Sequence, residues 1–253
     1  MEKEDKERML EELLRNPERY RCGPHYRASH IVFPVDFEGK RYVVKKPRWC
    51  QATINGYYAL QDEFFYRQRS WDGREALARE AEKLEVLEGL HVPRLCEFDG
   101  RTLVREYLEG TAASQVPDRL LQRIILEEGV ELLEAIHRRE VAVGDAQVKN
   151  LLHTPQGVYW LDFEGVFRGE NLLRLQAVDV LKFIYSSWTL YRSRERTLYA
   201  AEALAQVYSY GPVQEKVREL LQPESRSPLR LWFPTRLPVD GKLLLEIKMV
   251  LTR

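Results

Sequence analysis

Three polar residues stand at the two ends of one stretch of the chain, VGDAQVKNLLHTPQGVYWLDFEG, which is residues 143–165. Asp145 and Asn150 lie near its start, and Asp162 lies near its end. Between them, apolar pairs on either side of a Pro-Gln-Gly turn predict a β-hairpin with buried strands. A charge held close to a core costs stability unless something binds it. We therefore ask whether a cation and a phosphate bind at the mouth of this hairpin.

These residue types suit phosphoryl transfer. That reaction needs metal ions on the phosphate oxygens, a cation on the phosphates and a carboxylate that orients the acceptor hydroxyl. Mg2+ prefers hard oxygen ligands and keeps several waters, so one or two carboxylates and an amide oxygen are enough. Asp145, Asn150 and Asp162 are chemically such a set. The alternative is a surface hairpin whose Asp and Asn side chains serve only its turns.

The order Asp-x-x-x-x-Asn, hairpin, Asp-Phe-Glu resembles the catalytic loop and the metal loop of the protein-kinase-like superfamily. The 17 residues from Asp145 to Asp162 suit that family, in which one short hairpin joins the two loops. The resemblance implies that Asp145 is the catalytic carboxylate, that Asn150 and Asp162 bind magnesium, and that ATP and Mg2+ are the cofactors. Gly144 and Glu164, where Arg and Gly are usual, are similar to the atypical and small-molecule branches.

A kinase-like chain also needs a lysine on an early strand and a glutamate on the helix of its first lobe. The run YVVK, residues 42–45, resembles the family's V-A-I-K. Val43 and Lys45 share one face of that strand, so Lys45 would lie under the nucleotide with Val43 against the base. Glu80 falls within the apolar stripe of a helix predicted over 73–90, where a carboxylate needs a cationic partner. We expect a Lys45–Glu80 pair; a solvated lysine and a half-exposed glutamate are the alternatives.

Two more positions agree with the family. The run LVREYLEG, residues 103–110, resembles the hinge between the lobes, where the backbone of Glu106 and Leu108 would meet adenine. Asp179 falls where the superfamily has a buried aspartate that braces the catalytic loop, although a simple salt-bridged helix residue is the alternative. His137 resembles another recurrent position and is expected to be structural.

The chain departs from the family's pattern in its phosphate loop and at a residue that usually braces the catalytic loop. Only Gly23 occurs where a glycine-rich loop is expected, and Val143 replaces the usual histidine. No Ala-Pro-Glu motif follows Asp162, and about 15 residues separate that residue from the next helix core. A long activation loop is therefore absent, which argues against a regulated eukaryotic-type protein kinase. Because the glycine-rich loop is missing, the interpretation as a degenerate kinase stays open.

The spacing between the predicted hinge and Asp145 also distinguishes among the branches of the superfamily that the chain could resemble. Gly110 and Asp145 are 35 positions apart with one helix between them, which leaves little room for the substrate helices of aminoglycoside and choline kinases. Gln147 and Glu164 nevertheless match choline-kinase loops. The compact plan is more similar to the bacterial lipopolysaccharide-sugar kinases, the RIO kinases and the kinase subunit of the KEOPS complex. The resemblance covers residues 41–190 loosely and 143–165 well.

The pattern along the chain predicts an α+β fold with two lobes. Two β-rich runs around the turn DFEGK, residues 36–40, predict a hairpin in the first part, with Pro34 at a bulge or an edge. These strand signals and one helix precede a mostly helical part that contains the hairpin over 143–165. We expect an N-terminal lobe over 1–108 and a C-terminal helical lobe over 109–253. The other helices are expected over 3–15, 117–139, 171–192, 194–209 and 212–221, with a last strand or helix at the C-terminal end.

The composition of the chain limits the partners and the cellular environment that we expect for the protein. The 253 residues carry 39 Lys and Arg against 39 Asp and Glu, which argues against a nucleic-acid binder and leaves only residues 226–236 as a basic stretch. No run approaches the roughly 18 apolar residues of a membrane span. The charged N-terminus is not that of a signal peptide, and three widely spaced cysteines predict no disulfide framework. We expect a soluble, cytoplasmic protein.

The sequence therefore predicts an ATP- and Mg2+-dependent phosphotransferase that acts on a hydroxyl. The acceptor stays open among a sugar, a lipid-linked sugar, another small molecule and a protein serine. The alternative is a pseudokinase or nucleotide-binding interaction module. In that case the aromatic-rich segment 48–70 would be a surface for a protein partner, although its aromatics could equally be lobe core.

Overall fold

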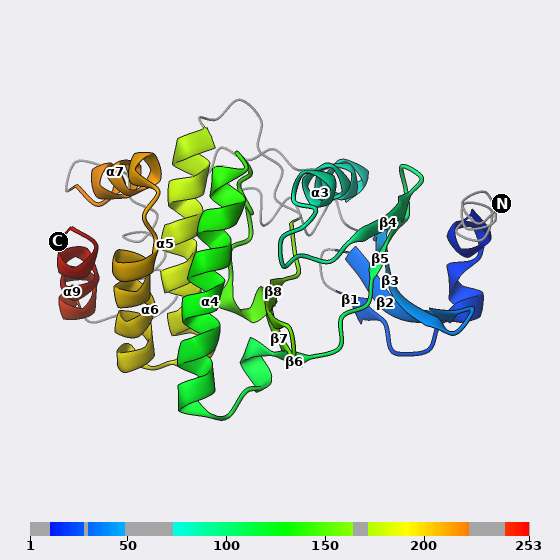
Figure 1. The fold of residues 1–253 in the computed structure, drawn as a ribbon, viewed down its shortest axis with the longest axis horizontal. Coiled ribbons are helices and arrows are strands. Elements are labelled where there is room, and N and C mark those ends of the chain that lie inside the picture. Colours follow the sequence, from blue (N-terminus) through cyan, green and yellow to red (C-terminus); the bar gives the residue numbers. More distant parts are fainter. Residues whose placement is uncertain (1–10, 28–29, 49–72, 164–171, 223–240, 253) are drawn as a thin grey trace.

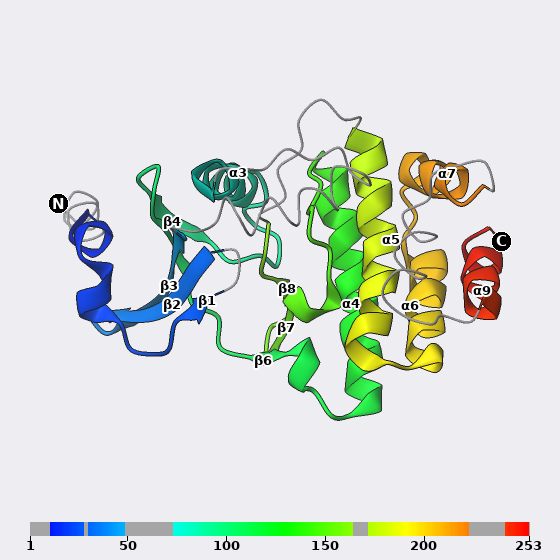
Figure 2. The same cartoon turned by 180° about the vertical axis from the view of Figure 1, so that it is seen from behind.

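The computed structural model describes residues 11–27, 30–48, 73–163, 172–222 and 241–252. The strand-rich part and the helical part lie at opposite ends of the molecule, with helix α3 (Gly73–Val86) and the hairpin over 151–160 between them (Figures 1 and 2). The chain passes from one part to the other between β5 (Leu103–Glu106) and β6 (Thr111–Ala112). The segments 49–72 and 226–236, for which interactions were predicted, lie outside the described residues.

An antiparallel sheet with strand order β1-β2-β3-β5-β4 forms the strand-rich part. Its strands are β1 (Tyr26–Arg27), β2 (His30–Phe37), β3 (Lys40–Pro47), β4 (Leu95–Phe98) and β5 (Leu103–Glu106). The β2–β3 hairpin was predicted, and its turn residues Glu38 and Gly39 have φ of 51° and 72°, as a tight hairpin turn requires. Pro34 causes no bulge in the β2–β3 register. It is not on an edge strand either, because β2 lies between β1 and β3, so the expectation of a bulge or an edge was wrong. The Pro34 carbonyl accepts from the Cys22 amide at 3.1 Å on the side away from β3, and the missing N–H of Pro34 therefore interrupts no bond to β3.

The outer face of this sheet is covered by the N-terminal helical turn that was predicted to end before Pro17. Leu13 in that turn is fully buried, and a 3-10 helix, η1 (Pro17–Tyr20), follows it. Leu13 belongs to a small core of apolar residues on β2, β3 and β5: Phe33, Val35, Phe37, Val44 and Val104. Alternation along β3 therefore sends Val44 into this core and Lys45 to the opposite face of the sheet.

Helix α3 (Gly73–Val86) packs against β3 and β4. It is shorter than the predicted 73–90. After Val86 the chain turns at Gly89, whose φ of 88° is in the left-handed region that ends helices. Leu77, Ala81 and Leu84 are buried on its inner face, and Glu80 is buried among them with no exposed surface.

The helical part matches the predicted pattern closely. Its helices are α4 (Arg119–Arg138), α5 (Leu172–Tyr191), α6 (Arg194–Val207), α7 (Gly211–Leu220) and α9 (Gly241–Leu251). The Asp118 carboxylate caps α4 by accepting from the Leu121 amide at 2.7 Å. α5 packs against α6 and α7, and the last element is a helix instead of a strand. None of the helices that the structure describes could span a bilayer.

The predicted hairpin is present and lies under α4. It consists of β7 (Leu151–Thr154) and β8 (Gly157–Trp160), with Leu151 opposite Trp160, and a short β6 (Thr111–Ala112) pairs with β7. Leu151 and Trp160 are fully buried. Gly129 of α4 lets the helix approach closely, because a Cβ there would lie 2.6 Å from the Leu151 side chain. The packed hairpin thus fixes the two loops that carry the polar residues.

Candidate active site

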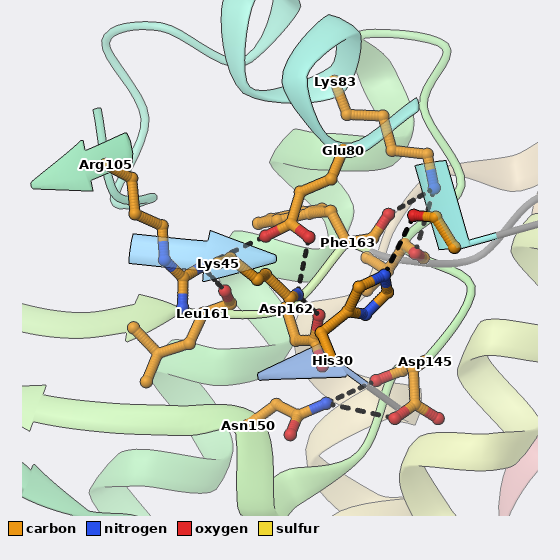
Figure 3. A network of polar contacts seen from close by, with 12 residues as sticks. His30, Lys45, Glu80, Lys83, Arg105, Asp145, Asn150, Leu161, Asp162 and Phe163 are labelled. Atoms are coloured by element: carbon orange, nitrogen blue, oxygen red, sulfur yellow. Dashed lines mark hydrogen bonds and ion pairs between the residues drawn. The ribbon is translucent and has the colours of Figure 1, made fainter. Parts of the chain in front are cut away.

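The predicted ion pair between strand and helix is confirmed. Lys45 Nζ on β3 lies 2.6 Å from Glu80 Oε2 on α3, and both side chains are buried, with 2% and 0% exposed (Figure 3). The same amine donates to Asp162 Oδ1 at 3.0 Å. Lys45 therefore joins the sheet, the helix and the loop after β8 at one point, which brings together three of the residues that the sequence selected.

Arg105 of β5 is a second cation on the carboxylate of Glu80, and it was not predicted from the sequence. Its NH1 lies 3.3 Å from Glu80 Oε1 and also donates to the carbonyl of Leu161. The β3–β5 register places Arg105 opposite Val43, which is on the same face as Lys45. That register was the signal that could have found it. Each oxygen of Glu80 thus has its own cation, as a buried carboxylate requires.

Lys83, one helical turn after Glu80, reaches into the helical part and was also missed. Its Nζ donates to the carbonyls of Val143 at 3.2 Å and Phe163 at 3.1 Å. Burial lowers the pKa of Lys83 to about 8, although Asp179 and the other nearby carboxylates oppose the change. Its position three residues after Glu80, on the adjoining helix face, was the only signal in the sequence.

Asp145 and Asn150 lie together in the loop before β7. Asn150 Nδ2 donates to the Asp145 carbonyl at 3.0 Å and to its Oδ2 at 3.3 Å (Figure 3). Gln147 Nε2 and Lys182 Nζ of α5 each lie 2.6 Å from Asp145 Oδ1. Burial alone would raise the pKa of the Asp145 carboxyl, but Lys182, assisted by Gln147, holds that pKa below its ordinary value. Asp145 is thus an ionised hydrogen-bond acceptor at neutral pH.

Asp179 braces this loop, as predicted. Its carboxylate accepts from the Val143 amide at 2.7 Å and from the Gly144 amide at 2.9 Å. His137 Nε2 lies 3.4 Å from the same carboxylate, and His137 Nδ1 lies 2.5 Å from the Tyr208 hydroxyl. His137 is fully buried in this network and away from the loop tips, which fits the structural role expected for it.

His30 and Lys182 are further polar residues at the site for which no sequence pattern gave a signal. His30 is buried at the start of β2, and its Nε2 lies 3.0 Å from the Gly73 carbonyl at the start of α3. Lys182 lies on α5, and its amine also donates to the Gly144 carbonyl at 3.2 Å. Both are brought in by packing between segments that are far apart in the chain.

The predicted hinge residues lie at the end of β5. Glu106 is the last residue of that strand, and its amide donates to the Arg94 carbonyl at 2.9 Å, while Leu108 follows outside the strand. Val43 is half-buried on β3. A cavity of about 730 Å³ lies around this end of the sheet, and its lining includes Tyr42 and Glu106 but none of Val43, Lys45, Asp145 or Asp162. The site is therefore defined by its polar network and not by this cavity.

The donor set fits a magnesium ion that shares its coordination with phosphates. Within the described ranges no three His, Cys, Asp or Glu residues gather into a metal cluster. Mg2+ does not need one, because one or two carboxylates and substrate phosphates are enough. Asn150 gives its amide nitrogen to Asp145, so its amide oxygen is the atom left for a cation. Asp162, in the loop after β8, would supply the carboxylate.

Comparisons with known proteins place the fold. No model of a known protein family matches the sequence, and a search of curated proteins finds no match. The Rio2 kinase of Chaetomium thermophilum, solved as an ADP/Mg2+–phosphoaspartate complex, is 15% identical, with 95% of this chain and 74% of that chain covered and a TM-score of 0.54. WaaP in complex with acyl carrier protein is 16% identical, with 92% and 88% covered and a TM-score of 0.45. The PknI kinase domain of Mycobacterium tuberculosis is 18% identical, with 79% and 93% covered and a TM-score of 0.43.

The sheet with its helix, the helical part with its hairpin and the structural similarity to Rio2 define the fold of this chain. It has the two-lobed α+β fold of the protein-kinase-like superfamily. In this fold the sheet and α3 belong to the N-terminal lobe, and α4 to α9 belong to the helical lobe.

Proposed function

We propose that the protein is an ATP- and Mg2+-dependent phosphotransferase that transfers the γ-phosphate of ATP to a hydroxyl group. The observation that carries the proposal is the position of Lys45, which pairs with Glu80 at 2.6 Å and with Asp162 at 3.0 Å. A cation held beside a metal-binding carboxylate is what the phosphates of ATP require. The structure of Rio2, which holds ADP and Mg2+ in the same fold, supports this choice of cofactors.

The nucleotide would lie between an N-terminal lobe of residues 1–108 and a C-terminal lobe of residues 109–253. Val43 would pack against the base, and the backbone of Glu106 and Leu108 would meet the adenine edge. Lys45, oriented by Glu80, would bind the phosphates. These assignments follow the face of β3 on which Val43 and Lys45 lie and the end of β5 next to it.

Asn150 and Asp162 would hold Mg2+, which neutralises charge on the phosphate oxygens when it is bound. Asp145 would accept the hydrogen bond of the acceptor hydroxyl and orient its oxygen toward the γ-phosphorus. As the new oxygen–phosphorus bond forms, the bond to ADP breaks and the hydroxyl proton leaves through Asp145 to solvent. The depressed pKa of Asp145 suits orientation better than strong base catalysis.

The proposed acceptor is an alcohol: a sugar, a lipid-linked sugar, another small molecule or a protein side chain. A cytoplasmic location, where ATP is abundant and thiols stay reduced, completes the proposal. Cys22 and Cys96 are free thiols, in keeping with that environment.

One observation favours a second candidate, a pseudokinase or nucleotide-binding interaction module. β1 ends at Arg27 and β2 begins at His30, so only residues 28–29 connect them. This connection and the strand ends on either side of it, residues 24–32 (PHYRASHIV), contain no glycine, so the family's G-x-G-x-x-G pattern is absent there. Nucleotide binding without transfer would follow if the γ-phosphate were not held.

Turnover tests the first candidate against the second. We would measure Mg2+-dependent ADP release, with water and with a panel of alcohols as acceptors, for the wild type, Asp145→Asn and Asp162→Asn. Asp36→Asn is the control, because Asp36 is exposed on β2. We expect turnover in the wild type and the control and a loss of at least about 100-fold in both site variants. Equal turnover in all four proteins would refute the proposal, and nucleotide binding without any turnover would establish the second candidate.

A further inference from the structure

Three consecutive residues of the metal loop are each held by a cation from the N-terminal lobe. Arg105 of β5 donates to the carbonyl of Leu161. Lys45 of β3 donates to the Asp162 carboxylate at 3.0 Å, and Lys83 of α3 donates to the carbonyl of Phe163 at 3.1 Å. Figure 3 shows the three side chains converging on this segment from three different elements. We name residues 161–163 the metal-loop tripeptide.

The other contacts of the three cations tie them to one another and to the catalytic loop. Lys45 and Arg105 share the two oxygens of Glu80, at 2.6 and 3.3 Å. Lys83 also donates to the carbonyl of Val143 at 3.2 Å, two residues before Asp145. Arg105 is 8% exposed and Lys45 is 2% exposed, so water competes little for these bonds. The tripeptide is therefore fixed to rigid strands and a helix instead of to a flexible loop.

We propose that Arg105 and Lys83 are positioning residues, which hold the backbone on both sides of Asp162 so that its carboxylate is kept ready for Mg2+. The inference rests on the proposed role of Asp162 as a magnesium ligand. Partners that orient a metal ligand typically change metal affinity by about 10–100-fold when they are removed. A carbonyl fixed before Asp162 and another fixed after it leave its backbone little freedom to rotate.

Arg105 has a second effect, which follows from the sharing of Glu80. When ATP is bound, Lys45 must direct part of its charge to the phosphates, and Glu80 would then be a buried carboxylate with a weakened partner. A buried charge that loses its partner is strongly destabilising. Arg105 pairs with the other oxygen of Glu80 at 3.3 Å and would keep that oxygen paired in such a state. Helix α3 would then keep its place when Lys45 binds nucleotide.

Lys83 supplies a bond that the side chain at position 143 cannot supply. Val143 is fully buried and apolar, so it offers only its backbone to the neighbouring loop. The Lys83 amine donates to the carbonyls of both Val143 and Phe163 and so bridges them. This bridge holds the catalytic loop and the metal loop at a fixed separation.

The test compares ADP affinity with and without Mg2+ in the full chain. The variants are Arg105→Met and Lys83→Met, their conservative partners Arg105→Lys and Lys83→Arg, and the control Arg79→Met. Arg79 lies on α3 but is exposed, and it pairs with Glu82 at 2.7 Å. We expect both Met variants to lose about tenfold or more of the affinity gained from Mg2+ while metal-free ADP affinity changes little. The conservative variants should recover part of the loss, and the control should match the wild type.

Amide hydrogen exchange of the nucleotide-free protein provides a readout that does not depend on the proposed function. The peptide that contains the metal-loop tripeptide should exchange faster in both Met variants than in the wild type and the control. If the wild type shows no Mg2+-dependent ADP binding but the exchange difference is present, the proposed function fails and the anchoring of the tripeptide stands. If the wild type binds ADP with Mg2+ and the Met variants keep the full gain and the same exchange, the positioning role is refuted.

Discussion

The substitution Glu80→Gln should be among the most destabilising single changes at the site. It removes the carboxylate that Lys45 and Arg105 share and leaves both cations buried. Breaking a buried pair by removing one partner costs about 3–5 kcal/mol. We expect a value of about 3 kcal/mol, because Lys45 keeps Asp162 and Arg105 keeps the Leu161 carbonyl. Lys45→Met should cost less, about 1–2 kcal/mol, because Glu80 still has Arg105.

Urea unfolding followed by circular dichroism at pH 7 measures both losses. Glu82→Gln is the matched control on the same helix, since Glu82 is exposed and its pair with Arg79 is a surface pair. That control should cost less than about 1 kcal/mol. The reasoning fails if Glu80→Gln costs no more than the control, or if Lys45→Met costs more than Glu80→Gln, because Arg105 would then contribute nothing to the burial of Glu80.

Three further predictions concern the loops. Lys182→Met removes the cation that pairs with Asp145 and should raise the pKa of the Asp145 carboxyl, so the acid limb of the pH–rate profile should move to higher pH. The control Lys216→Met, which breaks a pair with Glu219 away from the site, should leave the acid limb unchanged. The pKa of Lys83 is about 8 in the folded protein, against an ordinary value of 10.5. Between these pH values the unfolded chain binds more protons than the folded protein. The unfavourable contribution of Lys83 to the free energy of unfolding, which is full below pH 8, is therefore relieved as pH rises. Unfolding measurements on the wild type and Lys83→Met should therefore show their difference moving in favour of the wild type by about 2 kcal/mol from pH 8 to pH 10, and no change would contradict the burial of this amine. Asp179→Asn should cost about 2–3 kcal/mol and abolish turnover, because the Val143 and Gly144 amides donate to different oxygens of Asp179 and Asn replaces one of these oxygens with an NH2 donor. A stable, active variant would show that the loop is braced by other contacts.

The elements that could be predicted from the sequence are those with a strong local pattern. Alternation and turn residues predicted the β2–β3 hairpin and the hairpin over β7 and β8, and helical periodicity predicted α4 to α7 within a few residues. The last residues of α3 were assigned wrongly, because their apolar spacing continues while Gly89 turns the chain. β6 was missed because two residues are too short for any pattern.

Contacts in the candidate site could be predicted only where two separate sequence patterns indicated the same pair of residues. Lys45 at a strand end and Glu80 on an apolar helix face each indicated a partner, and their contact is confirmed. Arg105 and Lys83 act on backbone carbonyls 56 and 80 residues away, and no periodicity relates a side chain to a distant carbonyl. Lys182 reaches Asp145 only because α5 packs beneath the catalytic loop. Such contacts follow from the assembled fold and not from local sequence.

The most direct test of the account is ATP binding by calorimetry, with and without Mg2+, for the wild type and Asp162→Ala. Asp36→Ala, at an exposed position of β2, is the control. We predict binding to the wild type and the control that strengthens with Mg2+, and a loss of that gain, by about tenfold or more, in Asp162→Ala. Binding that is the same with and without Mg2+ and the same in Asp162→Ala would contradict the assignment of a metal–phosphate site at this hairpin.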